Sequence, residues 1–196
     1  MGLSKKNFLE IRSKYGHCSS WAIWADGGPK PKSNVGDLAV FDFEKNNQLL
    51  SQLNPNVVMV GLNISRRIEA PFGNFHDSKP QSQDYKLRHA IKDTPFYGAY
   101  MTDIIKDFEQ KISGQVSRYL KENKDFERQN ISLFEQELMD INSKNTLIIA
   151  FGNGSFEILD RYFQKKFKII KVPHYSNHIS QENYRASIIE ILGGQK

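Results

Sequence analysis

The hydrophobic pattern alternates short apolar runs with longer stretches of helical spacing. Continuous apolar runs, in contrast to alternating ones, are typical of strands in a parallel sheet that is covered on both faces. Four such runs predict strands over 57–62, 99–102, 146–151 and 167–172. Apolar residues at helical spacing predict helices over 4–15, 44–53, 83–91, 116–141 with a break, 155–163 and 181–192. This order predicts an α/β fold, a three-layer sandwich with a central, mainly parallel sheet of about four strands.

Length and composition predict one domain over 1–196, in which 1–55 supply N-terminal helices and a cover loop and 56–196 carry the α/β core. The 196 residues are 39% hydrophobic and 25% charged, so the chain can bury a core without disulfides or a metal. The sequence has no internal repeat and no low-complexity tract. The least regular segment, 16–37, contains the loop-forming sequence Gly-Gly-Pro-Lys-Pro and two tryptophans, which indicate an ordered cover.

Cysteine content and charge narrow the classes of function. Cys18 is the single cysteine, so an internal disulfide and a thiolate zinc site are excluded and a reducing compartment is favoured. No apolar run approaches the about 18 residues that span a bilayer, so we expect a cytoplasmic protein without membrane contact. The 27 Lys and Arg against 22 Asp and Glu give a net charge of +5, which favours an anionic partner such as nucleic acid. We expect a monomer without a cofactor.

Polar residues follow all four apolar runs, and ligands of an open parallel sheet bind at this edge. The residues that follow the runs are Asn63, Asp103, the segment 152–155 and the segment 174–178. Turn chemistry explains any one of them, because turns favour Asn, Asp and Gly. It does not require a histidine directly after a buried strand. Asn63 together with His174 predicts a group that orients water and a group that stabilises an anion.

The same strand ends resemble the motifs of the uracil-DNA glycosylase superfamily. The segment 58–63, Val-Met-Val-Gly-Leu-Asn, resembles a strand that runs into Gly-x-Asn-Pro or Gly-x-Asp-Pro. Pro-His-Tyr-Ser at 173–176 resembles the second motif, usually His-Pro-Ser. Thr-Asp-Ile-Ile-Lys at 102–106 is similar to Thr-Asn-x-x-Lys, and Ile-Ala-Phe-Gly at 149–152 is similar to the apolar strand that ends in glycine. The resemblance covers about 57–192 and implies the fold of that superfamily.

The resemblance implies a DNA glycosylase, which hydrolyses the N-glycosidic bond of a damaged or modified nucleotide flipped out of the duplex. Asn63 would orient the attacking water, and His174 would stabilise the negative charge on the departing base. The segment 70–75, Ala-Pro-Phe-Gly-Asn-Phe, resembles a segment whose aromatic ring stacks on the flipped base. Phe72 is therefore the first candidate for stacking and Phe75 the alternative, although either ring could instead fill the core.

Three departures from the motifs bear on the substrate. Ile64 and Tyr175 stand where the two motifs usually have proline. Asp103 stands at the position of the asparagine that reads uracil, and an ionised carboxylate accepts hydrogen bonds but donates none. A modified base, or one with an exocyclic amine, therefore fits Asp103 better than ordinary uracil does. Asp103 could also activate water or cap the following turn.

Contacts to DNA phosphates are expected around the same strand ends. The loop of residues 152–155 opens a helix whose free N–H groups could hold a phosphate. The lysines within 165–171 indicate either a solvated face or contacts to phosphates. Tyr175, His178 and Ile179 lie where the family places a wedge, a side chain that fills the gap left by the flipped base. The expected DNA-binding residues are Arg66, Arg67, Gly152, Asn153, Gly154, Ser155, Tyr175, Ser176, Asn177 and His178.

Other functions explain less of the sequence. A catalytically inactive nucleic-acid-binding protein on the same fold is the main alternative, because the departures from the motifs permit it. His174 and His178 suggest a metal site, but no third ligand is near them in sequence, so we expect no metal. Cys18 beside His17 suggests a nucleophile, yet a lone cysteine is usually an inert apolar residue. A nucleotide-metabolising enzyme would need a glycine-rich phosphate loop after the first strand, and 63–67 contain no glycine.

Overall fold

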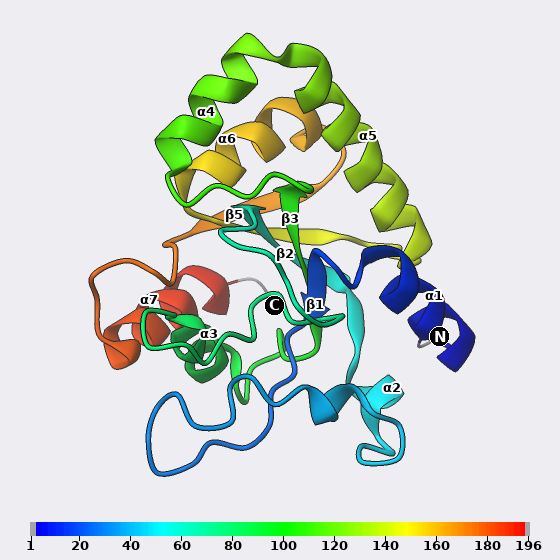
Figure 1. The fold of residues 1–196 in the computed structure, drawn as a ribbon, viewed down its shortest axis with the longest axis vertical. Helices are drawn as coiled ribbons and strands as arrows, with labels where there is room; N and C mark the ends of the chain where they lie inside the picture. Colours follow the sequence, from blue (N-terminus) through cyan, green and yellow to red (C-terminus); the bar gives the residue numbers. More distant parts are fainter. Residues whose placement is uncertain (1–2, 195–196) are drawn as a thin grey trace.

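The computed structural model describes residues 3–194, which form a five-stranded sheet between two layers of helices (Figure 1). The strands are β1 (Ser19–Trp21), β2 (Asn54–Asn63), β3 (Ala99–Ile105), β4 (Leu147–Phe151) and β5 (Lys168–Val172). Their order across the sheet is β1-β3-β2-β4-β5, and all pairs are parallel except β1 with β3. The predicted α/β architecture with a mainly parallel central sheet is confirmed. β1 is a three-residue edge strand without an apolar run and was not predicted.

Helices cover both faces of the sheet. Figure 1 shows α4, α5 and α6 on one face and α3 and α7 on the other. The helices are α1 (Lys5–Tyr15), α2 (Leu49–Gln52), α3 (Asp84–Ile91), α4 (Ser113–Glu122), α5 (Lys124–Asp140), α6 (Gly152–Phe163) and α7 (Gln181–Gly193), with a 3-10 helix at Leu38–Phe41. No helix between residues 3 and 194 has both the length and the apolar composition to cross a membrane.

The alternation of side chains along β2 builds two separate hydrophobic clusters. Val58 and Val60 pack into the cluster that includes α1, α5 and α6, whereas Val57 and Met59 pack into the cluster with α3 and α7. A strand that is buried on both faces must be apolar at every position, and this is why its sequence is a continuous apolar run. The predicted three layers follow from this burial.

The predicted helix over 44–53 is wrong, because only the short α2 forms there. Side chains in this segment bind the backbone N–H groups that a helix would use. Asp42 accepts from the N–H of Glu44 at 2.9 Å, and Asn46 accepts from the N–H of Gln48 at 3.2 Å. Asn46 also donates to the carbonyl group of Val40 at 3.0 Å. Local side-chain bonds of this kind favour turns over helix.

A buried ion pair ties the carboxyl end of β3 to α5. The Lys106 ammonium lies 2.5 Å from the Glu137 carboxylate, and the two side chains are only 5% and 0% exposed. Glu137 also accepts hydrogen bonds from the Tyr100 hydroxyl at 2.6 Å and the Thr102 hydroxyl at 2.9 Å. These bonds offset the cost of burying the two charges, and they fix the end of β3 that carries Asp103.

We expect Glu137→Ala to lower the free energy of unfolding by about 3–5 kcal/mol, because it leaves the Lys106 ammonium buried without a carboxylate. The matched control on the same helix is Glu135→Ala, which removes an exposed ion pair with Lys166 and should cost at most about 1 kcal/mol. Equilibrium unfolding in denaturant, followed by circular dichroism, measures both variants. Equal losses would contradict the structural role given to the buried pair.

Candidate functional site

A cleft of about 890 Å³ lies at the carboxyl ends of the parallel strands. Four strands each contribute one residue to the wall of the cleft. These are Asn63 from β2, Asp103 from β3, Gly152 after β4 and His174 after β5. Parallel strands end at the same edge of a sheet, so residues that are far apart in the chain meet there. The cleft therefore contains both residues that the sequence analysis selected for catalysis.

The Asn63 side chain is fixed by three backbone carbonyl groups. Its Nδ2 atom donates to the oxygens of Ile64, Phe108 and Gln110 at 2.8, 2.9 and 2.8 Å. Three acceptors around one atom identify that atom as the amide nitrogen, so the orientation of the amide is settled by its partners. Oδ1 is then the acceptor that remains for a ligand or a water in the cleft.

His174 is held in one tautomer by Ser176. The Nδ1 atom of His174 accepts from the Ser176 backbone N–H at 3.1 Å and from the Ser176 hydroxyl at 2.8 Å. Because a backbone N–H can only donate, Nδ1 has no proton and Nε2 carries it. Burial lowers the pKa of His174 to about 4, so the ring is neutral at pH 7. The ring thus offers an uncharged N–H donor in the cleft.

Asp103 lies within β3, since the strand continues to Ile105 and does not end at Thr102 as predicted. Its carboxylate accepts from Asn74 Nδ2 at 2.8 Å. Burial raises the pKa of Asp103 to about 6, against the opposing effects of the Asn74 bond and the Lys106 charge. Gly61, its neighbour on β2, is required here because a Cβ atom would collide with Asp103 Oδ1.

Asn74 and Asp84 also line the cleft and were not predicted from the sequence. Asn74 also donates to the Cys18 carbonyl group at 2.9 Å, so it holds Asp103 in place against the N-terminal segment. Asp84, the first residue of α3, is buried and accepts from the Asp77 backbone N–H at 2.8 Å. Burial raises the pKa of Asp84 to about 6. An Asp at a helix start and an Asn in a turn are common for structural reasons, so neither gave a signal.

The order of preference between Phe72 and Phe75 is corrected by the structure. Phe75 lines the cleft, and its ring centroid lies 6.2 Å from that of Phe151. Phe72 is fully buried in the core away from the cleft lining, with ring centroids of Phe8 and Phe41 at 5.4 and 5.3 Å. Phe75 is itself only 4% exposed and packs in the cluster with α3 and α7, so it borders the cleft with a small part of its surface.

Tyr175 forms an inner wall of the cleft. Its ring stacks on His174 with centroids 4.4 Å apart, and it meets the edges of Phe151 and Phe75 at 5.5 and 6.3 Å. Tyr175 and Ile179 are half-buried and pack against the cluster of α3 and α7, whereas His178 is exposed and lies outside the cleft lining. Of the three residues expected at the wedge position, only His178 projects freely into solvent.

The residues expected to contact DNA divide into three groups. Those that line the cleft are Arg66, Gly152, Asn153, Gly154, Tyr175, Ser176 and Asn177. Arg67 and His178 are exposed outside this lining. Ser155 is fully buried and its hydroxyl donates to the Phe151 carbonyl group at 2.8 Å, so its side chain is not available to contact DNA. Arg66 forms an ion pair with Asp77, which positions its guanidinium beside the cleft.

Gly152 lets α6 begin directly beside His174. Its φ of +77° is a conformation that favours glycine, and an added Cβ atom would lie 3.4 Å from the His174 Cβ atom. The helix starts at this residue, three residues earlier than predicted, so its first N–H groups lie at the cleft. Lys171 borders the same place and donates to Asn153 Oδ1 at 3.3 Å. The N–H groups at the start of α6 and the Lys171 ammonium give this rim a positive potential, which favours the binding of an anion.

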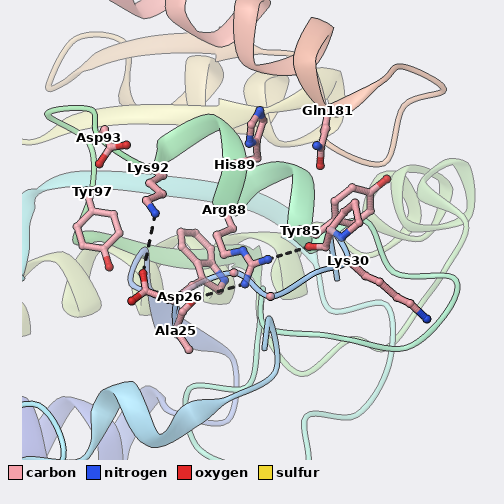
Figure 2. Close-up of a pocket in the computed structure, with 14 residues that line it drawn as sticks. Ala25, Asp26, Lys30, Tyr85, Arg88, His89, Lys92, Asp93, Tyr97 and Gln181 are labelled. Carbon is pink, nitrogen blue, oxygen red and sulfur yellow. Dashed lines mark hydrogen bonds and ion pairs between the residues drawn. The ribbon is translucent and has the colours of Figure 1, made fainter. Parts of the chain in front are cut away.

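A second cavity, of about 440 Å³, lies between α3 and the loop that contains Ala25 and Pro31 (Figure 2). Arg88 reaches across it and donates to the carbonyl groups of Ala25, Ser33 and Pro31 at 3.3, 2.8 and 2.8 Å. Lys92 lies 3.9 Å from Asp26. These polar groups are used to hold the loop on α3, whereas Asn63 and His174 keep bonding capacity free in the cleft. We therefore take the cleft as the candidate site.

Two alternative chemistries find no support in the described part of the chain. Residues 3–194 contain no group of three or more His, Cys, Asp or Glu side chains placed to hold a metal ion. Cys18 is buried, and this burial raises the pKa of its thiol to about 12. A thiol that stays protonated at pH 7 is a poor nucleophile.

We expect the native His174 ring to stay neutral as the pH falls to about 4, because burial disfavours the imidazolium ion. NMR of the ring nitrogens measures this titration, and the unfolded protein, with a pKa of about 6.5, is the reference. Since the unfolded chain binds the proton first, this residue lowers the stability of the fold as the pH falls from about 6.5 to about 4. If the native ring titrates near pH 6.5, His174 is not buried in the way that the structure indicates.

Comparison of the chain with models of protein families, with curated proteins and with solved structures gives no match. No relative supplies a function, so the function has to be argued from the geometry of the cleft.

Proposed function

We propose that this protein is a DNA glycosylase that hydrolyses the N-glycosidic bond of a flipped, damaged or modified nucleotide. The observation that carries the proposal is the meeting of Asn63, Asp103, His174 and Phe75 in one cleft. The resemblance to the uracil-DNA glycosylase superfamily gave Asn63 and His174 roles in catalysis and Asp103 a role in base recognition, and it named Phe75 as the alternative to Phe72 for stacking. The parallel sheet brings the strand-end residues to one edge, and the bonding capacity left free at Asn63 Oδ1 and His174 Nε2 supports the roles proposed for them.

The chemistry needs an oriented water and a stabilised leaving group. Asn63 Oδ1 accepts a hydrogen bond from the water, since its Nδ2 atom is held by carbonyl groups. The bond from the sugar C1′ to the base nitrogen breaks and its electron pair leaves with the base, while the water oxygen bonds to C1′ and releases a proton to solvent. The Nε2–H of His174 donates to the negative charge on the base. A neutral donor suffices, because the charge develops only as the bond breaks.

Recognition of the base depends on Asp103 and Phe75. Stacking on an aromatic ring such as Phe75 contributes about 1–3 kcal/mol per base without reading its identity. Above a pH of about 6 the Asp103 carboxylate is ionised and accepts hydrogen bonds only. A base that presents an exocyclic amine donates to it, whereas the O4 atom of uracil would face another acceptor. The favoured substrate therefore carries an amine at this edge.

The position of Tyr175 favours a second candidate function, binding of nucleic acid without base excision. Its ring covers one face of His174 and contacts Phe75, so it stands beside the surface on which a base would stack. Duplex and single-stranded oligonucleotides that carry a panel of altered bases separate the two functions. Abasic sites after incubation support the glycosylase, and binding to DNA without any abasic site supports the second function.

His174→Ala and Asn63→Ala should each lower base release by about 10²–10³-fold, because both groups stabilise the transition state. His17→Ala is the control, since His17 is an exposed histidine that pairs with Asp107 outside the cleft lining. Single-turnover release of the base measures activity, and thermal unfolding measures stability. Variants that release the base like the parent would contradict the assignment. A lower melting temperature is expected for Asn63→Ala alone, because it loses three hydrogen bonds.

Uracil should be a poor substrate at pH 7.5, and Asp103→Asn should improve its excision by about ten- to a hundredfold, because an amide donates to O4 where a carboxylate repels it. The pKa of Asp103 is raised to about 6, so the carboxyl group gains a proton and becomes a donor as the pH falls below 6. Uracil excision by the parent should therefore rise in that range, while the variant shows no such rise. Strong uracil excision by the parent at pH 7.5, unchanged or reduced in the variant, would refute this role.

A further inference from the structure

An exposed apolar side chain stands on the rim of the cleft. Ile112 is 56% exposed, and its chain neighbours Lys111 and Ser113 both line the cleft. Within residues 3–194, the other exposed large hydrophobic residues have no such flanks; they are Leu9, Tyr119, Leu133, Met139 and Ile189. Ile112 is thus an exposed aliphatic residue on the loop that forms this rim, between two residues of the cleft lining.

The loop that presents Ile112, between β3 and α4, is fixed to the site itself. Asn63 Nδ2 donates to the carbonyl groups of Phe108 and Gln110, and the Gln110 N–H donates to the Ile64 carbonyl group at 3.1 Å. The Gln110 side chain accepts from the Ile112 N–H at 3.1 Å. The position of Ile112 is therefore set relative to Asn63 by a short series of hydrogen bonds.

Aromatic packing supports the loop from the side of the helices. The ring of Phe108 stacks on that of Tyr119 in α4 with centroids 4.7 Å apart, and Tyr119 meets Phe126 of α5 at 5.5 Å. A side chain on such a support can press on a ligand without giving way, because displacement would cost these contacts.

The described residues of the loop after β5 offer no comparable exposed apolar group. Tyr175 and Ile179 pack inward, and His178 is a polar side chain. DNA-binding proteins insert rigid apolar side chains between base steps, which unstacks the bases and fills the space of a displaced nucleotide. Lys111 beside Ile112 can neutralise a phosphate at the same point. One apolar residue is too small for a stable protein interface, so DNA is the partner that this rim fits.

We infer that Ile112 is the wedge that enters the base stack of duplex DNA and fills the gap left by the flipped nucleotide. The inference rests on the proposed function of the cleft. It assigns the inserted group to the loop after β3, where the resemblance in sequence had pointed to the loop after β5.

The test uses a duplex with one tetrahydrofuran site, which provides a gap without any base to recognise, and an intact duplex of the same sequence. The parent should prefer the gapped duplex by about tenfold, and Ile112→Ala should lose most of this preference, because alanine cannot fill the gap. Met139→Ala is the matched control, since Met139 is a 65% exposed apolar residue on α5 away from the cleft lining. 2-Aminopurine opposite the gap reports insertion through its change in stacking.

Binding to single-stranded DNA should be equal for the parent and Ile112→Ala, since no stack has to be opened. A preference for the gapped duplex that Ile112→Ala retains, or a parent without this preference, overturns the inference. These measurements need no base release. Failure of the wedge is therefore distinguishable from failure of the proposed function, which would appear as the absence of abasic sites in the oligonucleotide panel.

Discussion

Parallel pairing of β2 with β3 on one side and with β4 on the other determines where the chemistry of this chain can lie. The pairing brings Gly61 level with Asp103, and Asn63 lies two residues further toward the same edge, level with Ile105. Because β5 continues the sheet in the same direction, His174 reaches that edge too. Asn63 and His174 lie more than 100 positions apart in the chain, so the geometry of the cleft depends on the stability of the whole sheet.

The parts of the fold that the sequence predicted are those with a strong physical signature. Strands buried on both faces are apolar over most of their length, and this made β2, β3 and β4 visible. The edge strand β5 has exposed Lys168 and Lys171 and was visible through Ile169, Ile170 and Val172. Placing ligand groups at carboxyl ends of strands then selected Asn63, Asp103 and His174 without further information. Confirmation of the sheet and of the shared cleft supports this reasoning, whereas the activity stays a proposal.

The parts that the sequence did not predict depend on local geometry that has no periodic signal. Phe72 and Phe75 lie three residues apart and both have positive φ, yet their rings enter the two different hydrophobic clusters and only Phe75 also borders the cleft. Ser155 sits in a helix start that reads as a phosphate loop, but its hydroxyl bonds to the chain four residues earlier. Asp84 and Asn74 gain their importance from neighbours that only folding brings close.

The hydrogen bonds of Asn63 also restrict which residue can stand at that position. The motif that the segment resembles accepts either asparagine or aspartate, but here a carboxylate would face three carbonyl oxygens at less than 3 Å. Repulsion between these acceptors would open the loop between β3 and α4. A substitution of Asn63 by aspartate would therefore need compensating changes in the loop between β3 and α4. The end of β2 and this loop are expected to change together in evolution.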